Sequence, residues 1–179
     1  LGVDMICQED EKVCPFDCVY CSLGETTERT TERRTFVDSE DVEEEFLKIP
    51  EDIEADVLTL SGTGEPTLAR NLEEVIGMAR DTLSFPIAVL TNSALMARVD
   101  VREELAGADI VVGSLDASDP EVFDEVNKPH PTLDFEEIIE GMKLFADDFR
   151  GLFSLEVMFV PQNKDFSEGI AEIAEEIGP

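Results

Sequence analysis

The sequence of 179 residues has few basic side chains. It contains 13 lysines and arginines against 43 aspartates and glutamates, which gives a formal net charge of −30 at pH 7. No cluster of lysines and arginines is visible, so the sequence does not favour a nucleic-acid-binding surface. The acidic residues are spread over every expected helix. This distribution is typical of a solvated acidic shell, as in halophilic proteins, and an acidic partner-binding face is the alternative.

Long hydrophobic runs are also missing. No apolar stretch approaches the length of a transmembrane helix, and no signal peptide is recognisable. We therefore expect a cytoplasmic protein that has no membrane partner. The sequence begins with Leu1 rather than Met and stops at Pro179, just after a helical pattern. We expect a fragment of a longer chain, in which residues 1–179 form one domain or most of one.

Cysteines are few but clustered. Cys14, Cys18 and Cys21 have the spacing C-x3-C-x2-C, and only Cys7 lies outside this loop. Thiolates are soft ligands, and three on one short loop can converge on one metal centre. In a reducing compartment this pattern indicates metal binding rather than disulfides. A four-iron cluster held by only three thiolates keeps one iron open for another ligand.

Two other interpretations of this loop remain open at the level of the sequence. A structural zinc site would take Cys7 or His130, the lone histidine, as its fourth ligand. An electron-carrying iron–sulfur cluster would take Cys7 as its fourth thiolate. Without such a role, Cys7 is expected to be a small buried hydrophobic residue and His130 a surface-loop histidine.

Short apolar runs alternate with amphipathic stretches, which predicts an α/β fold with a parallel sheet. Strands are expected at residues 1–6, 57–61, 87–91, 110–115 and 152–160. Helices are expected from about residue 38, at 71–83 and 99–106, from 119–120, and at 135–145 and 167–177. The apolar strands predict a sheet covered on both faces, and residues 24–34 are expected to form an exposed loop. A partial or full β/α barrel fits best, and an open doubly wound sheet is the alternative.

Ligands in such folds gather at the carboxyl ends of the parallel strands. These ends carry the cysteine loop and the other candidate binding residues, which are Gly62, Thr63, Gly64, Glu65, Asn92, Ser114 and Asp116. The glycine-rich turn with Glu65 suits a ligand's ammonium group, and a tight turn with an acid near a helix start is the alternative. This turn lacks the Lys-Ser/Thr ending of a P-loop.

Tyr20, the lone tyrosine, lies between two of the clustered cysteines. Its ring either stacks on a flat ring bound beside the metal or packs on the core. Asn92, Ser114 and Asp116 suit hydrogen bonds to a sugar, but residues of these types also serve in caps and turns.

The motif Cys14-x3-Cys18-x-Tyr20-Cys21, with the turn at residues 62–65, resembles the radical S-adenosylmethionine (SAM) superfamily. Residues 60–68 (LSGTGEPTL) and 114–119 (SLDASD) resemble an archaeal-type branch that includes tRNA wyosine-synthesis enzymes. The resemblance covers nearly the whole chain and identifies residues 1–179 as a radical SAM core domain. It implies a partial (β/α)6 TIM-type barrel with five βα units present and the sixth strand missing beyond Pro179.

The resemblance also implies the chemistry. Cys14, Cys18 and Cys21 would hold a [4Fe–4S] cluster, and SAM would bind the open iron through its amino and carboxyl groups. The reduced cluster would cleave SAM to methionine and a 5′-deoxyadenosyl radical, which abstracts a hydrogen atom from a substrate. The implied SAM contacts are Gly62, Thr63, Gly64 and Glu65 at the amino group, Tyr20 at the adenine, and Asn92, Ser114 and Asp116 at the ribose or methionine.

The resemblance leaves the partners less defined. A flavodoxin- or ferredoxin-type donor is implied as the source of the electron, and the substrate is unknown. A tRNA substrate is not supported by the charge of the chain. The second cysteine cluster that wyosine-synthesis enzymes carry upstream is also missing from the sequence.

Overall fold

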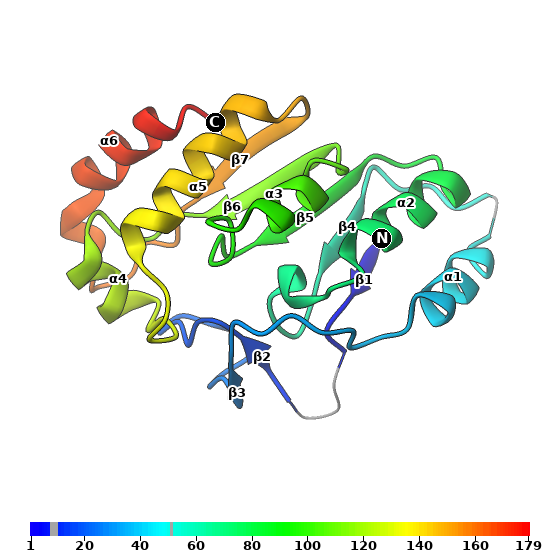
Figure 1. Ribbon diagram of the computed structural model, residues 1–179, viewed down its shortest axis with the longest axis horizontal. Helices are drawn as coiled ribbons and strands as arrows, with labels where there is room; N and C mark the ends of the chain where they lie inside the picture. The colour runs from blue at the N-terminus through cyan, green and yellow to red at the C-terminus, as the bar shows by residue number, and fades with distance from the viewer. Residues whose placement is uncertain (8–10, 51) are drawn as a thin grey trace.

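A computed structural model describes residues 1–7, 11–50 and 52–179 (Figure 1). Its main sheet has five parallel strands in the order β1-β4-β5-β6-β7. Their bounds are β1 Gly2–Asp4, β4 Leu58–Ser61, β5 Ile87–Thr91, β6 Ile110–Ser114 and β7 Leu152–Glu156. The strand order follows the chain, without the reversal that a doubly wound sheet has. The predicted α/β fold with a partial barrel is therefore confirmed.

Helices connect the strands, as the amphipathic stretches predict. Their bounds are α1 Ser39–Leu47, α2 Leu72–Thr82, α3 Val99–Leu105, α4 Pro120–Val126, α5 Phe135–Asp148 and α6 Ser167–Ile177. Two short 3₁₀ helices, η1 Pro66–Leu68 and η2 Lys164–Phe166, lie in the connections. The helix after Asp119 begins with Pro120 because the Asp119 carboxylate caps it, accepting a hydrogen bond from Val122 N. None of the helices in the described part of the chain is long and apolar enough to cross a membrane.

The expectation that both faces of the sheet are covered holds along most of β5, where Ile87, Ala88 and Val89 are all buried, but not along β4 and β6. Burial alternates along β4 and β6, so that Leu58, Leu60, Val111 and Gly113 are buried while their neighbours stay partly exposed. Helix α5 packs against the buried face, where a Cβ on Gly113 would lie 3.5 Å from Met142 Cε. The other face keeps apolar residues such as Leu90, which is 39% exposed. This second face lines a cavity described below, which explains why the strands are apolar on both sides.

The segment after the cysteines is more ordered than an exposed loop. β2 (Val13–Cys14) pairs in parallel with β3 (Glu28–Arg29), and Arg33 is buried with 8% of its surface exposed. Most of residues 24–34 are partly or fully exposed, as predicted, but the prediction is wrong at Arg33. The reason is tertiary, because the guanidinium has acceptors on two distant parts of the chain.

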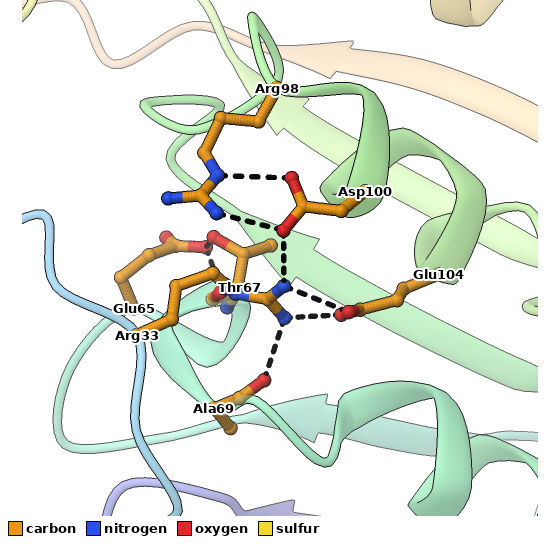
Figure 2. A network of polar contacts seen from close by, with 7 residues as sticks. All are labelled: Arg33, Glu65, Thr67, Ala69, Arg98, Asp100 and Glu104. Atoms are coloured by element: carbon orange, nitrogen blue, oxygen red, sulfur yellow. Dashed lines mark hydrogen bonds and ion pairs between the residues drawn. The ribbon is translucent and has the colours of Figure 1, made fainter.

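Arg33 connects this segment to the turn after β4 and to α3 (Figure 2). Its Nε donates to the Thr67 carbonyl at 2.8 Å, and its Nη2 donates to the Ala69 carbonyl at 2.9 Å. Its Nη1 lies 3.1 Å from Asp100 Oδ2, and the guanidinium pairs with both carboxylate oxygens of Glu104. The planar fork of an arginine suits this set of acceptors.

Replacing Arg33 with methionine should destabilise the fold by about 3–5 kcal/mol, because it leaves the Glu104 carboxylate and two carbonyls without their donor. Arg33→Lys should recover only part of this loss, since an ammonium group cannot donate to all four partners at once. Urea unfolding followed by circular dichroism measures both effects.

Arg34→Met is the matched control. The Arg34–Glu28 pair is exposed, with side-chain exposures of 45% and 37%, so its loss should cost about 1 kcal/mol or less. If Arg33→Met and Arg34→Met lower the free energy of unfolding equally, burial does not strengthen the contacts of Arg33.

The pairing of Asp100 predicts a pH dependence. Its hydrogen bonds from Arg98, and then from Arg33, lower the pKa of the Asp100 carboxyl to about 2. A carboxyl whose pKa falls on folding stabilises the protein above its unfolded pKa, and this contribution disappears as the pH falls through the folded pKa. The stability difference between the wild type and Asp100→Asn should therefore be largest above about pH 4 and shrink toward pH 2. Urea titrations at several pH values measure this difference in the free energy of unfolding. A difference that stays constant between pH 4 and pH 2 would contradict the prediction.

Candidate active site

The cysteine loop has a fixed position next to α4. Backbone hydrogen bonds hold it there. Asp17 N donates to Asn127 O at 2.9 Å and to Lys128 O at 3.3 Å, Val19 N donates to Val126 O at 2.9 Å, and His130 N donates to Pro15 O at 2.8 Å. Phe16 pairs with Pro129 in the same contact. The two prolines near His130 thus belong to a segment that supports the cysteine loop.

The three clustered cysteines line one cavity of about 230 Å³ at the carboxyl ends of the strands. Its wall also includes residues from β4, β5, β6 and β7, among them Ser61, Leu90, Val112 and Glu156. Most of the residues predicted from the sequence meet here, namely Tyr20, Gly62, Gly64, Glu65, Asn92 and Ser114. Thr63 and Asp116 do not line this cavity and bind other protein groups instead.

The two glycines of the turn allow close contact between chain segments. A Cβ on Gly62 would lie 1.9 Å from Asp4 Oδ1, and one on Gly64 would lie 1.9 Å from Val13 O. Neither glycine has a positive φ, so the conformational freedom expected from the sequence is not what the turn requires. The Asp4 carboxylate accepts hydrogen bonds from Thr63 N at 3.0 Å and Thr63 Oγ1 at 2.9 Å, which fixes the turn to the end of β1.

Glu65 is 2% exposed and accepts four hydrogen bonds. Its Oε1 accepts from Thr67 N (3.1 Å), Thr67 Oγ1 (2.7 Å) and Thr91 Oγ1 (2.6 Å), and its Oε2 accepts from Asn92 N (2.7 Å). Burial raises the pKa of this carboxyl, because none of these donors is charged. No ion pair reaches Glu65 within residues 1–7, 11–50 and 52–179.

The tight-turn interpretation of Glu65 is confirmed, and its contact with a ligand's ammonium group stays a prediction. Glu65 caps η1 by accepting from Thr67 N, as an acid near a helix start does, and it also lines the cavity. A ligand's ammonium group would supply a positive charge in direct contact with Glu65, which no ion pair among the described residues provides. Oε2 accepts one hydrogen bond and so keeps unused acceptor capacity.

Asp116 is buried and its carboxylate is occupied within the protein. Oδ2 accepts from Tyr20 Oη at 2.5 Å and from Asn127 Nδ2 at 2.8 Å, while Oδ1 accepts from Met158 N at 2.8 Å. The Tyr20 hydroxyl is therefore held on one side, and its ring borders the cavity. Asp116 positions Tyr20 and the segment after β7. A direct contact of Tyr20 with adenine stays a prediction.

The environment of the thiols fits a metal cluster. Burial, and then the nearby Glu65 charge, raise the pKa of Cys14 to about 12, and burial raises the pKa of Cys18. Such thiols need a cationic centre beside them in order to ionise. Both sulfurs also accept a hydrogen bond from a side-chain amide. Asn92 Nδ2 donates to Cys14 Sγ at 3.2 Å, and Asn127 Nδ2 donates to Cys18 Sγ at 3.4 Å.

The spread of the cysteines favours a cluster over a single ion. In the described part of the chain, no three His, Cys, Asp or Glu side chains lie close enough together to hold one metal ion. A zinc ion needs four ligands within about 2.3 Å, whereas a four-iron cluster distributes its thiolates over separate irons. Cys7 and His130 do not line the cavity. The prediction that Cys7 is buried is wrong, since it is exposed, and His130 Nδ1 lies 2.8 Å from Thr132 Oγ1.

Lys12 is a residue of the cavity that the sequence analysis missed. It is 7% exposed, its Nζ donates to the Gly24 carbonyl at 2.9 Å, and it is the one cationic side chain among the described residues of the cavity wall. Its charge lowers the pKa of Cys14 and Cys18, although burial outweighs this effect. The one available signal was proximity in sequence, because Lys12 precedes the first clustered cysteine by two residues.

Comparison with known proteins gives a consistent result. The Radical SAM superfamily profile matches residues 12–175. A UPF0026 protein of Methanocaldococcus jannaschii is 40% identical over 168 residues, covering 92% of this chain and 52% of the relative. A UPF0026 protein of Synechocystis is 37% identical over 158 residues, covering 88% and 58%. The chain thus spans about half the length of the curated relatives it matches.

Solved structures share the fold at low sequence identity. The native anSMEcpe structure with bound AdoMet has a TM-score of 0.73 and 17% identity, covering 98% of this chain and 48% of that one. TYW1 with a lysine-pyruvate adduct has a TM-score of 0.68 and 19% identity, covering 92% and 58%. The wyosine-related branch inferred from the sequence is thus represented among the neighbours. With the family profile extending over nearly all of its length, the chain belongs to the radical SAM superfamily.

Proposed function

We propose that the chain is the core of an enzyme that cleaves SAM reductively and uses the resulting radical to abstract hydrogen from a substrate. The observation that carries this proposal is the single cavity that three cysteines and an uncompensated buried carboxylate line together. Membership of the superfamily supports the general reaction. The core domain is assigned to residues 1–179.

Cys14, Cys18 and Cys21 would hold a [4Fe–4S] cluster, since the three thiols share one cavity wall. When bound and reduced by a flavodoxin- or ferredoxin-type donor, this cluster supplies the electron that breaks a carbon–sulfur bond of SAM. The chain itself provides placement and shelter from water. The backbone contacts between the cysteine loop and residues 126–130 fix the position of the loop before any cofactor binds.

The polar groups of the cavity match the two charged ends of an amino acid. Glu65 is the buried anion and suits the amino group of the methionyl part of SAM, while Lys12 is the buried cation and suits its carboxylate. Tyr20 offers an aromatic ring for the adenine, and Ser114 offers a hydroxyl for the ribose. These are the roles that the resemblance implied, with Lys12 added and Asp116 moved to a supporting position.

The alternative of a closed, electron-carrying cluster is less well supported, because Cys7 does not line the cavity. A wyosine-type modification of tRNA is a narrower form of the proposed function. TYW1 among the structural neighbours favours it, while the net charge of −30 does not. A relative in Saccharolobus islandicus, 27% identical over 157 residues, is named a probable GTP 3′,8-cyclase, which favours a nucleotide substrate as another form.

Cys18→Ala should abolish both cluster binding and SAM cleavage, because two cysteines cannot hold the cluster. After anaerobic reconstitution, iron and sulfide analysis measures the first, and release of 5′-deoxyadenosine with dithionite and SAM measures the second. We expect about one cluster per wild-type chain and a loss of activity of at least about a thousandfold in the variant.

Cys7→Ala is the matched control, since it removes an exposed cysteine outside the cavity. It should retain both the cluster and SAM cleavage. If Cys7→Ala instead loses the cluster, Cys7 is the fourth ligand and the electron-carrier interpretation holds. Zinc without iron in protein purified under exclusion of oxygen would favour the structural-zinc alternative.

Lys12→Met should raise the KM for SAM by about tenfold to a hundredfold, because one charge-assisted hydrogen bond contributes about 1.5–3 kcal/mol. Methionine keeps most of the apolar stem and removes the ammonium group, together with its hydrogen bond to the Gly24 carbonyl. Steady-state release of 5′-deoxyadenosine at varied SAM concentration provides the measurement. Lys48→Met, which removes an exposed lysine paired with Glu45, is the control and should leave the KM unchanged. An unchanged KM in Lys12→Met would exclude Lys12 from SAM binding.

A further inference from the structure

Two asparagine side chains donate hydrogen bonds to the sulfurs of the cysteine loop. Asn92 Nδ2 lies 3.2 Å from Cys14 Sγ, and Asn127 Nδ2 lies 3.4 Å from Cys18 Sγ. The donors come from different parts of the fold, the end of β5 and the loop after α4. Two sulfurs of one site thus receive the same kind of amide contact independently.

Both amides are held in place by further contacts. Asn92 Oδ1 accepts from Ala94 N at 2.9 Å, so its amide nitrogen is directed toward Cys14. Its backbone N–H donates to Glu65 Oε2. Asn127 Nδ2 donates its second hydrogen to Asp116 Oδ2 at 2.8 Å.

The amide nitrogens of the other two asparagines donate only to oxygen. Asn71 Nδ2 donates to Val37 O and Ser39 Oγ, and Asn163 Nδ2 donates to Asp116 O and Met158 O. Among the four asparagines, only the two at the cysteine loop donate to sulfur.

These contacts matter because the site disfavours negative charge. Cys14 is buried, and the Glu65 carboxylate lines the same cavity. Reduction of an iron–sulfur cluster adds one negative charge, shared with the ligand sulfurs. Hydrogen bonds donated to those sulfurs stabilise the reduced form and raise the reduction potential.

We propose that the side-chain amides of Asn92 and Asn127 set the reduction potential of the cluster through their hydrogen bonds to Cys14 Sγ and Cys18 Sγ. This inference rests on the proposed function, because it requires a cluster on these cysteines. In the reduction step one electron passes from the donor to the cluster, and the amides neither gain nor lose electrons or protons. Asn92 and Asn127 are positioning residues that act through the cysteines.

The test is a potentiometric titration of the reconstituted protein with dithionite, followed by the electron paramagnetic resonance signal of the reduced cluster, without SAM. Asn92→Leu and Asn127→Leu should each shift the midpoint potential to a more negative value. In the double variant the two shifts should add, because the donors act on different sulfurs. Unchanged potentials in cluster-containing variants would overturn the inference.

One control variant separates the hydrogen bonds to sulfur from a general disturbance of the protein. Asn71→Leu removes an asparagine that lies away from the cavity and donates only to oxygen. It should keep the wild-type potential. A shift in Asn71→Leu equal to those in Asn92→Leu and Asn127→Leu would overturn the inference.

A measurement on the wild type needs no variant that might lose its cluster. Protein labelled with ¹⁵N in the asparagine side chains should show nuclear couplings to the reduced cluster in pulsed electron paramagnetic resonance, from the amides bound to the two sulfurs. Absence of such couplings would overturn the inference. If the wild type binds no cluster or releases no 5′-deoxyadenosine, the proposed function itself fails. If it does both and the potentials do not move, only this inference fails.

Discussion

The candidate site depends on one buried carboxylate without a charged partner. Glu65 accepts from the two donors of Thr67 and from Thr91 and Asn92, so it connects the turn after β4 with the end of β5. An ionised carboxylate in such a place is costly unless hydrogen bonds and an opposite charge compensate it. The chain supplies the hydrogen bonds, and the charge is left to a ligand. The same contacts fix Asn92, whose side chain reaches Cys14.

The cysteine strand and the glycine-rich turn form one unit, although they are distant in sequence. Glu65 N donates to Val13 O at 3.1 Å, and Val13 pairs with Gly64 next to Cys14. A side chain on Gly64 would collide with Val13 O and push the cysteine strand away. Gly64 is therefore needed because two backbone segments of the chain approach each other closely here. The spacing between thiols and Glu65 follows from backbone hydrogen bonds rather than from flexible side chains.

The sequence predicted the parts of the fold that depend on local patterns. Strand β5 and helix α6 have the predicted bounds, because apolar periodicity defines them, and the cysteine spacing identified the family. The burial of Arg33 and Lys12 was not predictable in this way. A charged residue is buried only when partners from elsewhere surround it, and those of Arg33 lie on η1 and α3 (Figure 2). Local sequence likewise gave no sign that Asp116 faces inward toward Tyr20.

The acidity of the chain and the chemistry of the cavity are separable. Surface charges act over about 8–10 Å at physiological ionic strength, so most of the acidic side chains on the helices are screened from the cavity. Inside it, the field comes from Glu65, Lys12 and the amides of Asn92 and Asn127, where screening by salt is weak. The electrostatic interactions of the acidic surface can therefore vary with the salt concentration, while those between the buried groups and the thiols stay nearly constant. Such a division explains how so acidic a protein can still offer a site suited to adding an electron.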